Sequence, residues 1–181
     1  STTTASSSIL TITSGVSGES LSLTGSGVLG AASAGTQTIT NNNTLAIADG
    51  TGGLASNYTL SGATINVTII PRTLNVTLSR EYDGTTSVSG ALLTPTFDSL
   101  QGGETLALSG TGSVSTANVG SSKAVSLGSI ALVAGSGNPS NYSLNSATMN
   151  VTQRVINLDG IRAYDATTNV LSSDINTFGN I

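Results

Sequence analysis

The chain has 181 residues, of which 8% are charged, and its five Lys and Arg against nine Asp and Glu give a formal net charge of -4. This length suits one ordinary domain or two small ones, and the few scattered cations exclude a nucleic-acid-binding groove. Cys and His are absent, which excludes zinc and copper sites, disulfides, and Ser-His-Asp or Cys-His catalysis. No apolar run approaches the ~20 residues that a membrane span needs.

Three segments recur farther along the chain with similar residues in the same order: GESLSLTGSG at 18–27 and GETLALSGTG at 103–112, SNYTLSGATINVT at 56–68 and SNYSLNSATMNVT at 140–152, RTLNVTLSREYDGTT at 72–86 and RVINLDGIRAYDATT at 154–168. The rare residues follow the same repeat: Tyr58 with Tyr142, Tyr82 with Tyr164, Phe97 with Phe178, Arg72 with Arg154, and Arg80 with Arg162. We therefore predict a first unit at residues 1–71 that lacks its opening strand, a complete unit at 72–153, and the start of a third unit at 154–181.

The alternation of side chains predicts an all-β fold. Apolar and polar residues alternate, as in half-buried strands, in TLNVTLS at 73–79, TLALS at 105–109, KAVSLGSIALV at 123–133 and ATMNVT at 147–152. Gly, Asn, Asp and Ser lie between these stretches and provide turn signals. Several short strands in a unit of about 80 residues indicate tandem immunoglobulin-like β-sandwich modules, because a solenoid repeats every ~20–45 residues.

The junctions between the predicted units are short. One strand leads into Pro71-Arg72 and the next begins at once, and the same arrangement is expected around Gln153-Arg154. Two residues leave little freedom for a hinge, and proline fixes its own φ angle. The modules are therefore expected to form a fairly stiff rod.

A motif with the pattern Arg-x-Tyr-Asp-x-Thr-Thr follows the opening strand of the second and third units, at Arg80, Tyr82, Asp83 and Gly84 and again at Arg162, Tyr164 and Asp165. Asp-Gly is a turn signal, so we expect Asp83 and Gly84 to form a turn and Tyr82 to pack its ring on the module and bond through its hydroxyl. Arg80 is expected to pair with Asp83 or with a carboxylate of the adjacent unit. Ala166 replaces Gly84 in the third unit, so that turn is expected to avoid positive φ there. This structural interpretation is preferred to a ligand pocket.

A second pair of tyrosines, Tyr58 and Tyr142, precedes the last strand of each unit. Each is expected to bond back to an upstream backbone group, as in a tyrosine corner, in preference to binding a ligand. Glu19 and Glu104 occupy equivalent positions, but a glycosidase needs two carboxylates about 5–10 Å apart and the acids here are sparse. We therefore assign no catalytic residue and predict that the protein is not an enzyme.

Other chemistry has weak support. Calcium could use Asp83 and Asp98, but no run of alternating Asp and Asn ligands supports such a site, so no metal or cofactor is predicted. Lys123 has no basic counterpart in the first unit. An isopeptide crosslink that serves a repeat should recur, so Lys123 is expected to be a solvated lysine.

The segment REYDGTTSVSGALL at residues 80–93, the central LSGTG and ANVG, and the closing NPSNYSLNSATMNVTQR resemble the YDG repeat (similar to MBG modules) of very large secreted bacterial adhesins. The resemblance covers essentially the whole chain, as partial, complete and partial units. It implies a stalk segment of a filamentous-haemagglutinin-like exoprotein, located outside the cell on the bacterial surface or in the extracellular matrix. It supplies no catalytic residue.

The leading functional hypothesis is a structural repeat module of an extracellular adhesin or fibre, acting as a stalk or matrix filament in cell adhesion or biofilm. A glycan-binding module is the alternative, although every aromatic occupies a repeat position. Ice binding by Thr-x-Thr rows is weaker still. The expected partners are neighbouring repeats, other copies in a filament, and host or matrix glycans, with no nucleic acid and no membrane insertion.

The unequal units raise a further hypothesis. The first unit lacks an opening strand, and residues 154–181 begin with a strand of that kind. One chain could complete another by donor-strand exchange and form a self-assembling filament. A window of a longer continuous rod is the alternative, and it is preferred.

Overall fold

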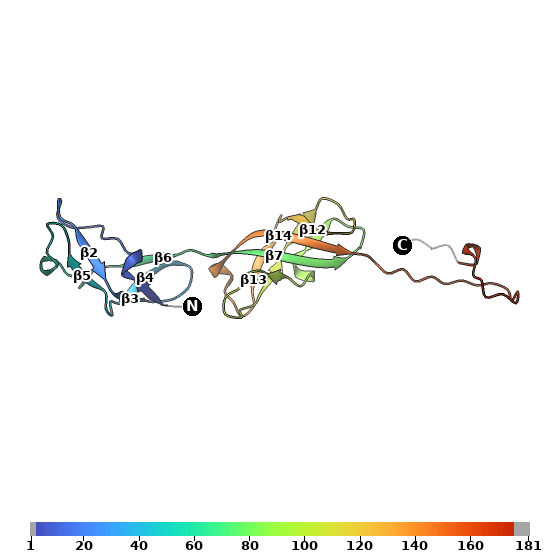
Figure 1. Cartoon of the computed structure of the whole chain (residues 1–181), viewed down its shortest axis with the longest axis horizontal. Coiled ribbons are helices and arrows are strands. Elements are labelled where there is room, and N and C mark those ends of the chain that lie inside the picture. Colours follow the sequence, from blue (N-terminus) through green and yellow to red (C-terminus); the bar gives the residue numbers. More distant parts are fainter. Residues whose placement is uncertain (1–2, 176–181) are drawn as a thin grey trace.

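The computed structural model describes residues 3–175, and this part of the chain is all-β, as predicted. It contains strands and single-turn 3-10 helices, and no α-helix occurs among the described residues. None of their helical segments is long and apolar enough to cross a membrane. Figure 1 shows a first unit and a second unit following one another along the longest axis, with the remaining chain as a tail beyond them.

The first unit contains two small antiparallel sheets. Its elements are β1 (Thr4–Ser6), η1 (Ser7–Ile9), β2 (Leu21–Thr24), β3 (Ser26–Leu29), β4 (Gly35–Asn41), β5 (Ala46–Asp49), η2 (Ala55–Asn57) and β6 (Asn66–Ile69). One sheet has the order β1-β3-β4-β6, and β2 pairs with β5. Its small core consists of Ala5, Leu29, Ile39 and Leu45.

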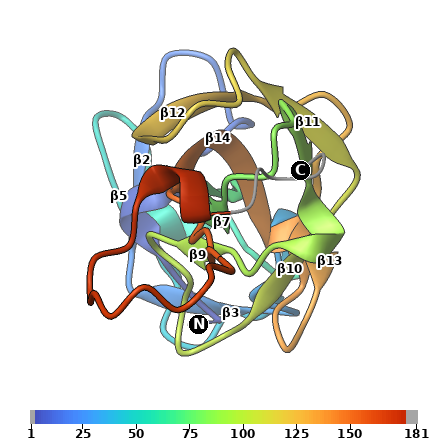
Figure 2. The same ribbon diagram turned by 90° about the vertical axis from the view of Figure 1, so that its right-hand side faces the viewer.

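The second unit is larger and forms curled sheets (Figure 2). Its elements are β7 (Arg72–Glu81), β8 (Ser87–Ser89), η3 (Gly90–Leu92), β9 (Thr96–Phe97), β10 (Leu106–Ser109), β11 (Thr111–Val114), β12 (Gly120–Ser126), β13 (Ala131–Ala134), η4 (Pro139–Asn141) and β14 (Tyr142–Thr152). Six strands pair in the order β8-β11-β12-β14-β7-β9, and β10 pairs with β13. The predicted stretch at 123–133 is therefore two strands, because Leu127 and Ile130 close a turn between β12 and β13.

The central feature of the second unit is the parallel pair β7 and β14. The pairing extends from Arg72 opposite Tyr142 to Glu81 opposite Thr152. Every second residue of β7 enters the core, and Leu74, Val76 and Leu78 are at most 2% exposed. The alternation in TLNVTLS thus produces one apolar face, which is buried against β10 and β14.

The repeat is visible in the pairing. Antiparallel β4 and β6 correspond to β12 and β14, and β1 with β3 corresponds to β8 with β11. The first unit differs in one respect, since no strand pairs with the outer edge of β6 among residues 3–175. Residues 58–65, which correspond to the first part of β14, are consequently not a strand.

The short junction between the first two units is confirmed, since only Ile70 and Pro71 separate β6 from β7. The corresponding prediction after β14 is wrong. Residues 155–163 form no strand. Gly160 makes an isolated bridge with Ile175, and the 3-10 helix η5 (Ser172–Asp174) ends immediately before Ile175. The reason is that residues 155–163 have no partner strand, whereas β7 pairs with β14 on one side and with β9 on the other. Phe178 lies outside the described residues.

Candidate functional site

Arg80 organises the motif that follows β7. Its guanidinium donates to Asp83 Oδ2 at 3.1 Å, to Thr85 Oγ1 at 3.1 Å, to the Ser87 carbonyl at 2.5 Å, and to the Thr85 carbonyl. The side chain of Arg80 is only 10% exposed, although its Nε has no protein partner. Asp83 Oδ1 accepts the Thr85 N–H, and this bond is the main cause of the lowered pKa of Asp83. Of the two partners expected for Arg80, Asp83 or a carboxylate of the adjacent unit, Asp83 is the one that it contacts.

The same arrangement forms in the tail. Arg162 donates to Asp165, to the hydroxyl and carbonyl of Thr167, and to the Asn169 carbonyl. The Thr167 N–H is again the main cause of a lowered pKa, here of Asp165. No second sheet packs against this copy among the described residues, so the turn depends on its own side chains and not on a surrounding module.

The prediction that Ala166 avoids positive φ is wrong. Ala166 has φ of 57°, close to the 76° of Gly84 in the other copy. An alanine in this conformation costs about 1 kcal/mol. Arg162 donates to Thr167 and Asp165 accepts from it, and these bonds fix the backbone around Ala166 and offset that cost.

The motif tyrosines are more exposed than predicted. Tyr82 is 38% exposed and Tyr164 is 95% exposed. Neither hydroxyl forms a hydrogen bond with a described residue, so the expected bond of Tyr82 is not found, and its ring packs only in part. The Tyr82 N–H donates instead to the Thr152 carbonyl and extends the pairing of β7 with β14.

The second cluster centres on Tyr142, which is 7% exposed. The Gln101 N–H donates to the Tyr142 hydroxyl at 3.1 Å, and the hydroxyl donates to Glu104 Oε2 at 2.5 Å. The predicted bond to an upstream backbone group is confirmed. Sequence reasoning missed the carboxylate partner, although Glu19 and Glu104 repeat in step with the tyrosines.

The first unit repeats this cluster. The Val16 N–H donates to the Tyr58 hydroxyl at 3.3 Å, and Tyr58 donates to Glu19 Oε2 at 2.6 Å. Glu19 and Glu104 therefore act as hydrogen-bond acceptors within separate units. The two acids do not form a carboxylate pair.

We expect the stability of the second unit to decrease as pH rises above 10. Burial, followed by the hydrogen bond to Glu104, raises the pKa of Tyr142 above its ordinary value of 10.0. Because the folded pKa is above the unfolded one, this stabilisation is fully present below pH 10 and is lost as pH rises through the folded pKa. Thermal unfolding should be compared at neutral pH and at about pH 11. Tyr142→Phe should lose less stability over that range, and equal losses would contradict the assignment.

A polar network not anticipated from sequence joins β7 to its neighbours. Asn75 donates its N–H and Nδ2 to the carboxylate of Asp98, and its Oδ1 accepts from Asn145 and Ser146 of β14. The Asn75 N–H is the main cause of the lowered pKa of Asp98. Asp83 and Asp98 thus bind protein groups at different places, and no cluster of potential metal ligands is found within residues 3–175.

Lys123 is not a freely solvated lysine. Its Nζ donates to the carbonyl and hydroxyl of Thr116, at 2.6 and 2.9 Å, and to the Asn118 carbonyl at 2.5 Å. The side chain closes the loop between β11 and β12. The prediction failed because carbonyl acceptors leave no signal in sequence.

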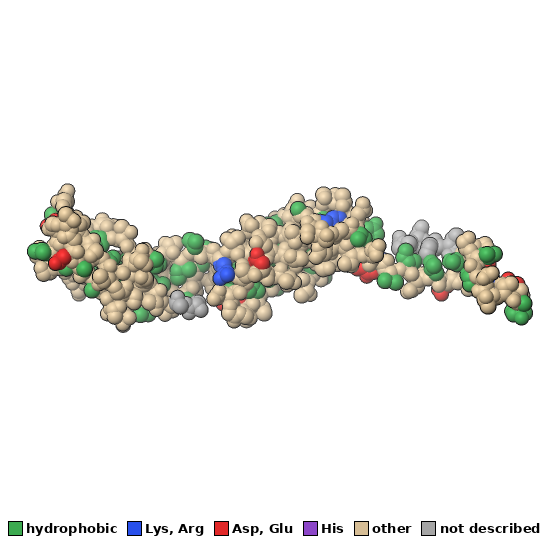
Figure 3. Space-filling view, in the orientation of Figure 1, with side chains coloured by type: hydrophobic (Ala, Val, Ile, Leu, Met, Phe, Trp, Pro, Cys, Tyr) green, Lys and Arg blue, Asp and Glu red, His purple; other side chains and the backbone are tan. Residues whose placement is uncertain are grey.

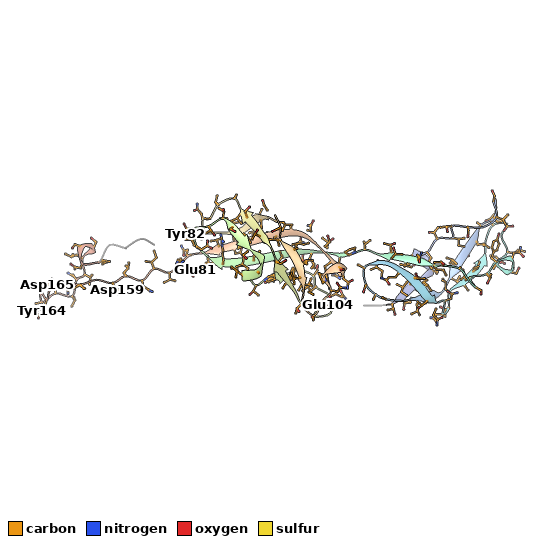
Figure 4. All side chains as sticks on the ribbon, turned by 180° about the vertical axis from the view of Figure 1, so that it is seen from behind. Glu81, Tyr82, Glu104, Asp159, Tyr164 and Asp165 are labelled. Atoms are coloured by element: carbon orange, nitrogen blue, oxygen red, sulfur yellow. The ribbon has the colours of Figure 1, made fainter. Side chains whose placement is uncertain are left out.

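The junction between the units contains one direct hydrogen bond, from the Ala34 N–H to Asn141 Oδ1 at 2.8 Å. Arg72 beside it donates to Gln101 Oε1 at 2.9 Å. A cavity of about 220 Å³ lies here, lined by Ala32, Ala34, Ile69, Ile70, Arg72, Gln101, Glu104, Asn141 and Tyr142. Figure 4 shows Glu104 at this end of the second unit and Glu81 and Tyr82 at the opposite end. The two clusters therefore lie at opposite ends of the second unit.

Comparison with known families identifies part of this arrangement. Residues 66–149 match the model of the YDG domain. The match begins at the first residue of β6, ends within β14, and contains the Arg80 turn and the Tyr142 cluster. A YDG domain is therefore present in the chain. No curated protein and no solved structure matches the sequence.

Proposed function

We propose that this chain, with its YDG domain at residues 66–149, is a structural repeat segment of an extracellular bacterial adhesin or fibre. In this role its units are immunoglobulin-like sandwich modules that follow one another in a stiff rod. The rod acts as a stalk or matrix filament and holds other parts of the assembly away from the cell. Neighbouring units are its main partners.

The observation that carries the proposal is the use of the motif side chains within the fold. Arg80 is held by four groups of its own turn, and Glu104 accepts from Tyr142. The charged side chains that a ligand pocket would use are bonded to protein groups, whereas Tyr82 and Tyr164 remain exposed. Because both clusters repeat with the units, they support a recurring building block in preference to a single binding site.

The form of the junction supports stiffness. Proline limits the rotation of a two-residue connection between β6 and β7, and the bond from Ala34 to Asn141 joins the units at a second point. Two points of attachment restrict both bending and twisting.

Asn141→Ala should loosen the junction without unfolding either unit, because it removes the acceptor of the Ala34 N–H. Small-angle X-ray scattering of residues 1–181 should show a wider distribution of lengths for the variant than for the wild type. Asn57→Ala is the matched control, since Asn57 is the repeat counterpart of Asn141 and its side chain is exposed. A compact wild-type particle, or equal broadening by both variants, would contradict the rod.

The proposed location outside the cell follows from the resemblance to repeats of secreted adhesins, and the low charge and the absence of Cys are compatible with it. An antibody raised against residues 1–181 should label intact cells that produce the protein. Labelling that requires lysis of the cells would contradict this location.

A further inference from the structure

The first and last strands of the second unit lie side by side. β7 begins at Arg72, β14 ends at Thr152, and the two strands are parallel neighbours in the interior of the six-stranded sheet. The chain therefore enters the unit at one end of this strand pair and leaves it at the other end, along the longest axis of the molecule (Figure 1). Tension applied to the chain on both sides of the unit pulls the two strands in opposite directions along their length.

This direction of load decides how the strand pair breaks. The hydrogen bonds of a sheet run between the strands, so opposed forces along the strands load all of these bonds together. Each of the ten residues of β7 has a partner in β14, and the Tyr82 N–H adds a further bond to the Thr152 carbonyl. If the chain entered and left at the same end of the pair, the bonds would open one after another and at a lower force.

The two faces of β7 also resist sliding along β14. Leu74, Val76 and Leu78 are buried in the core, whereas Asn75 and Thr77 are exposed. A slip by one residue would turn the polar side chains into the core and the apolar ones into solvent. A slip by two residues would restore the faces, but it requires a shift of about 6.6 Å with the bonds of the pair broken.

The side chain of Asn75 holds the register of the pair. The pairing has an irregularity between Leu144 and Ser146, where β14 contains one extra residue, Asn145. Asn75 Oδ1 accepts from Asn145 Nδ2 at 3.0 Å and from Ser146 Oγ at 2.7 Å, while Asn75 Nδ2 donates to Asp98 Oδ2 at 2.7 Å. A bulge fits the partner strand at one place only, and Asn75 ties β7 to that place.

We propose that β7 and β14 form a mechanical clamp through which the second unit resists stretching of the chain. This function goes beyond the proposed rod, because a rod resists bending and the clamp resists tension. The clamp consists of residues of the second unit alone. Its strength therefore does not depend on the neighbouring segments or on the location of the protein.

The clamp contains almost no charge. The charged residues of β7 are Arg72, Arg80 and Glu81, which lie at its two ends, and β14 has none. Figure 3 shows few charged side chains over the second unit. Because screening by salt weakens ion pairs and not this pairing, the rupture force should be the same at about 0.05 and 1 M sodium chloride. A force that decreases with salt would assign the load to the ion pairs at the strand ends, against the proposal.

The test is single-molecule pulling of residues 1–181 in two directions, which two introduced cysteines define because the chain has no Cys. Ile70→Cys with Gln153→Cys attaches the handles at opposite ends of the strand pair, and Ile70→Cys with Ser140→Cys attaches both at the same end. All three residues are exposed, so both variants should melt at the wild-type temperature. At one loading rate, the first pair should rupture at a force at least about threefold higher than the second.

Two alanine variants in the first handle geometry test the role of Asn75. Asn75→Ala should lower the rupture force at least about 1.3-fold, because it removes the ties to the bulge and to Asp98. Ser79→Ala is the matched control on the same face of β7, since its side chain forms no hydrogen bond with a described residue. Equal forces in the two handle geometries would overturn the clamp, whatever scattering shows of the rod. Equal forces for the two alanine variants would overturn the role of Asn75.

Discussion

Replacing Leu74 with alanine should lower the free energy of unfolding of the second unit by about 3 kcal/mol. Leu74 is 0% exposed and packs against Leu106 and Tyr142, so its removal leaves a cavity at one end of the core. Each unit has few aromatic residues, so few large side chains are available to move into the cavity and fill it. Thermal and urea unfolding of residues 1–181 would measure the loss.

Ile156→Ala is the matched control for Leu74→Ala, because Ile156 occupies the same position of the repeated segment. Its side chain is 58% exposed, so in dilute solution the change should be below about 0.5 kcal/mol. Comparable losses in the two variants would mean that the tail is packed in the single copy, in conflict with the structure.

Replacing Arg80 with alanine should destabilise the second unit by about 2 kcal/mol. The guanidinium is largely buried and donates to the carbonyls of Thr85 and Ser87, which lose their charged partner in the variant. The turn that leads from β7 to β8 then has fewer restraints, and the edge of the six-stranded sheet should fray. Arg80→Lys should recover only part of the loss, because an ammonium cannot reproduce the planar fork.

Arg162→Ala provides the control for Arg80→Ala. Arg162 makes the same set of bonds within the tail, where no described module packs against it. Its removal should leave the melting temperature of the second unit unchanged while it increases hydrogen exchange at Thr167. A fall in melting temperature equal to that of Arg80→Ala would show that the motif acts between units and not within one.

The assignment of the polar clusters as structural has a common physical basis. Arg80 and Tyr142 each bind backbone groups that the strands leave unpaired at the ends of the second unit. Backbone groups that no strand pairs are satisfied by such side chains, and a chain with 8% charged residues has few of them.

Local chemistry was readable from sequence. The alternation in residues 73–79 predicted both β7 and its buried face, and the repeated Arg-x-Tyr-Asp pattern predicted the pairing of Arg80 with Asp83. The repeat itself aligned residue 1 with a position just after the counterpart of β7. These features depend on residues close together in the chain or on similarity between segments, and both are visible in the sequence.

Long-range pairing was decided only by the tertiary structure. Residues 72–81 and 154–163 have similar patterns, with Gly160 in place of Leu78. The first segment is a strand between β14 and β9, while the second pairs with no sheet in the described chain. A strand is stable only when another backbone satisfies its N–H and C=O groups. An alternating pattern therefore shows that a segment can form a strand, but a partner strand decides whether it does. Ala166 adopts positive φ because Arg162 donates to the Thr167 carbonyl and Asp165 accepts from the Thr167 N–H, and these bonds outweigh the intrinsic preference of alanine.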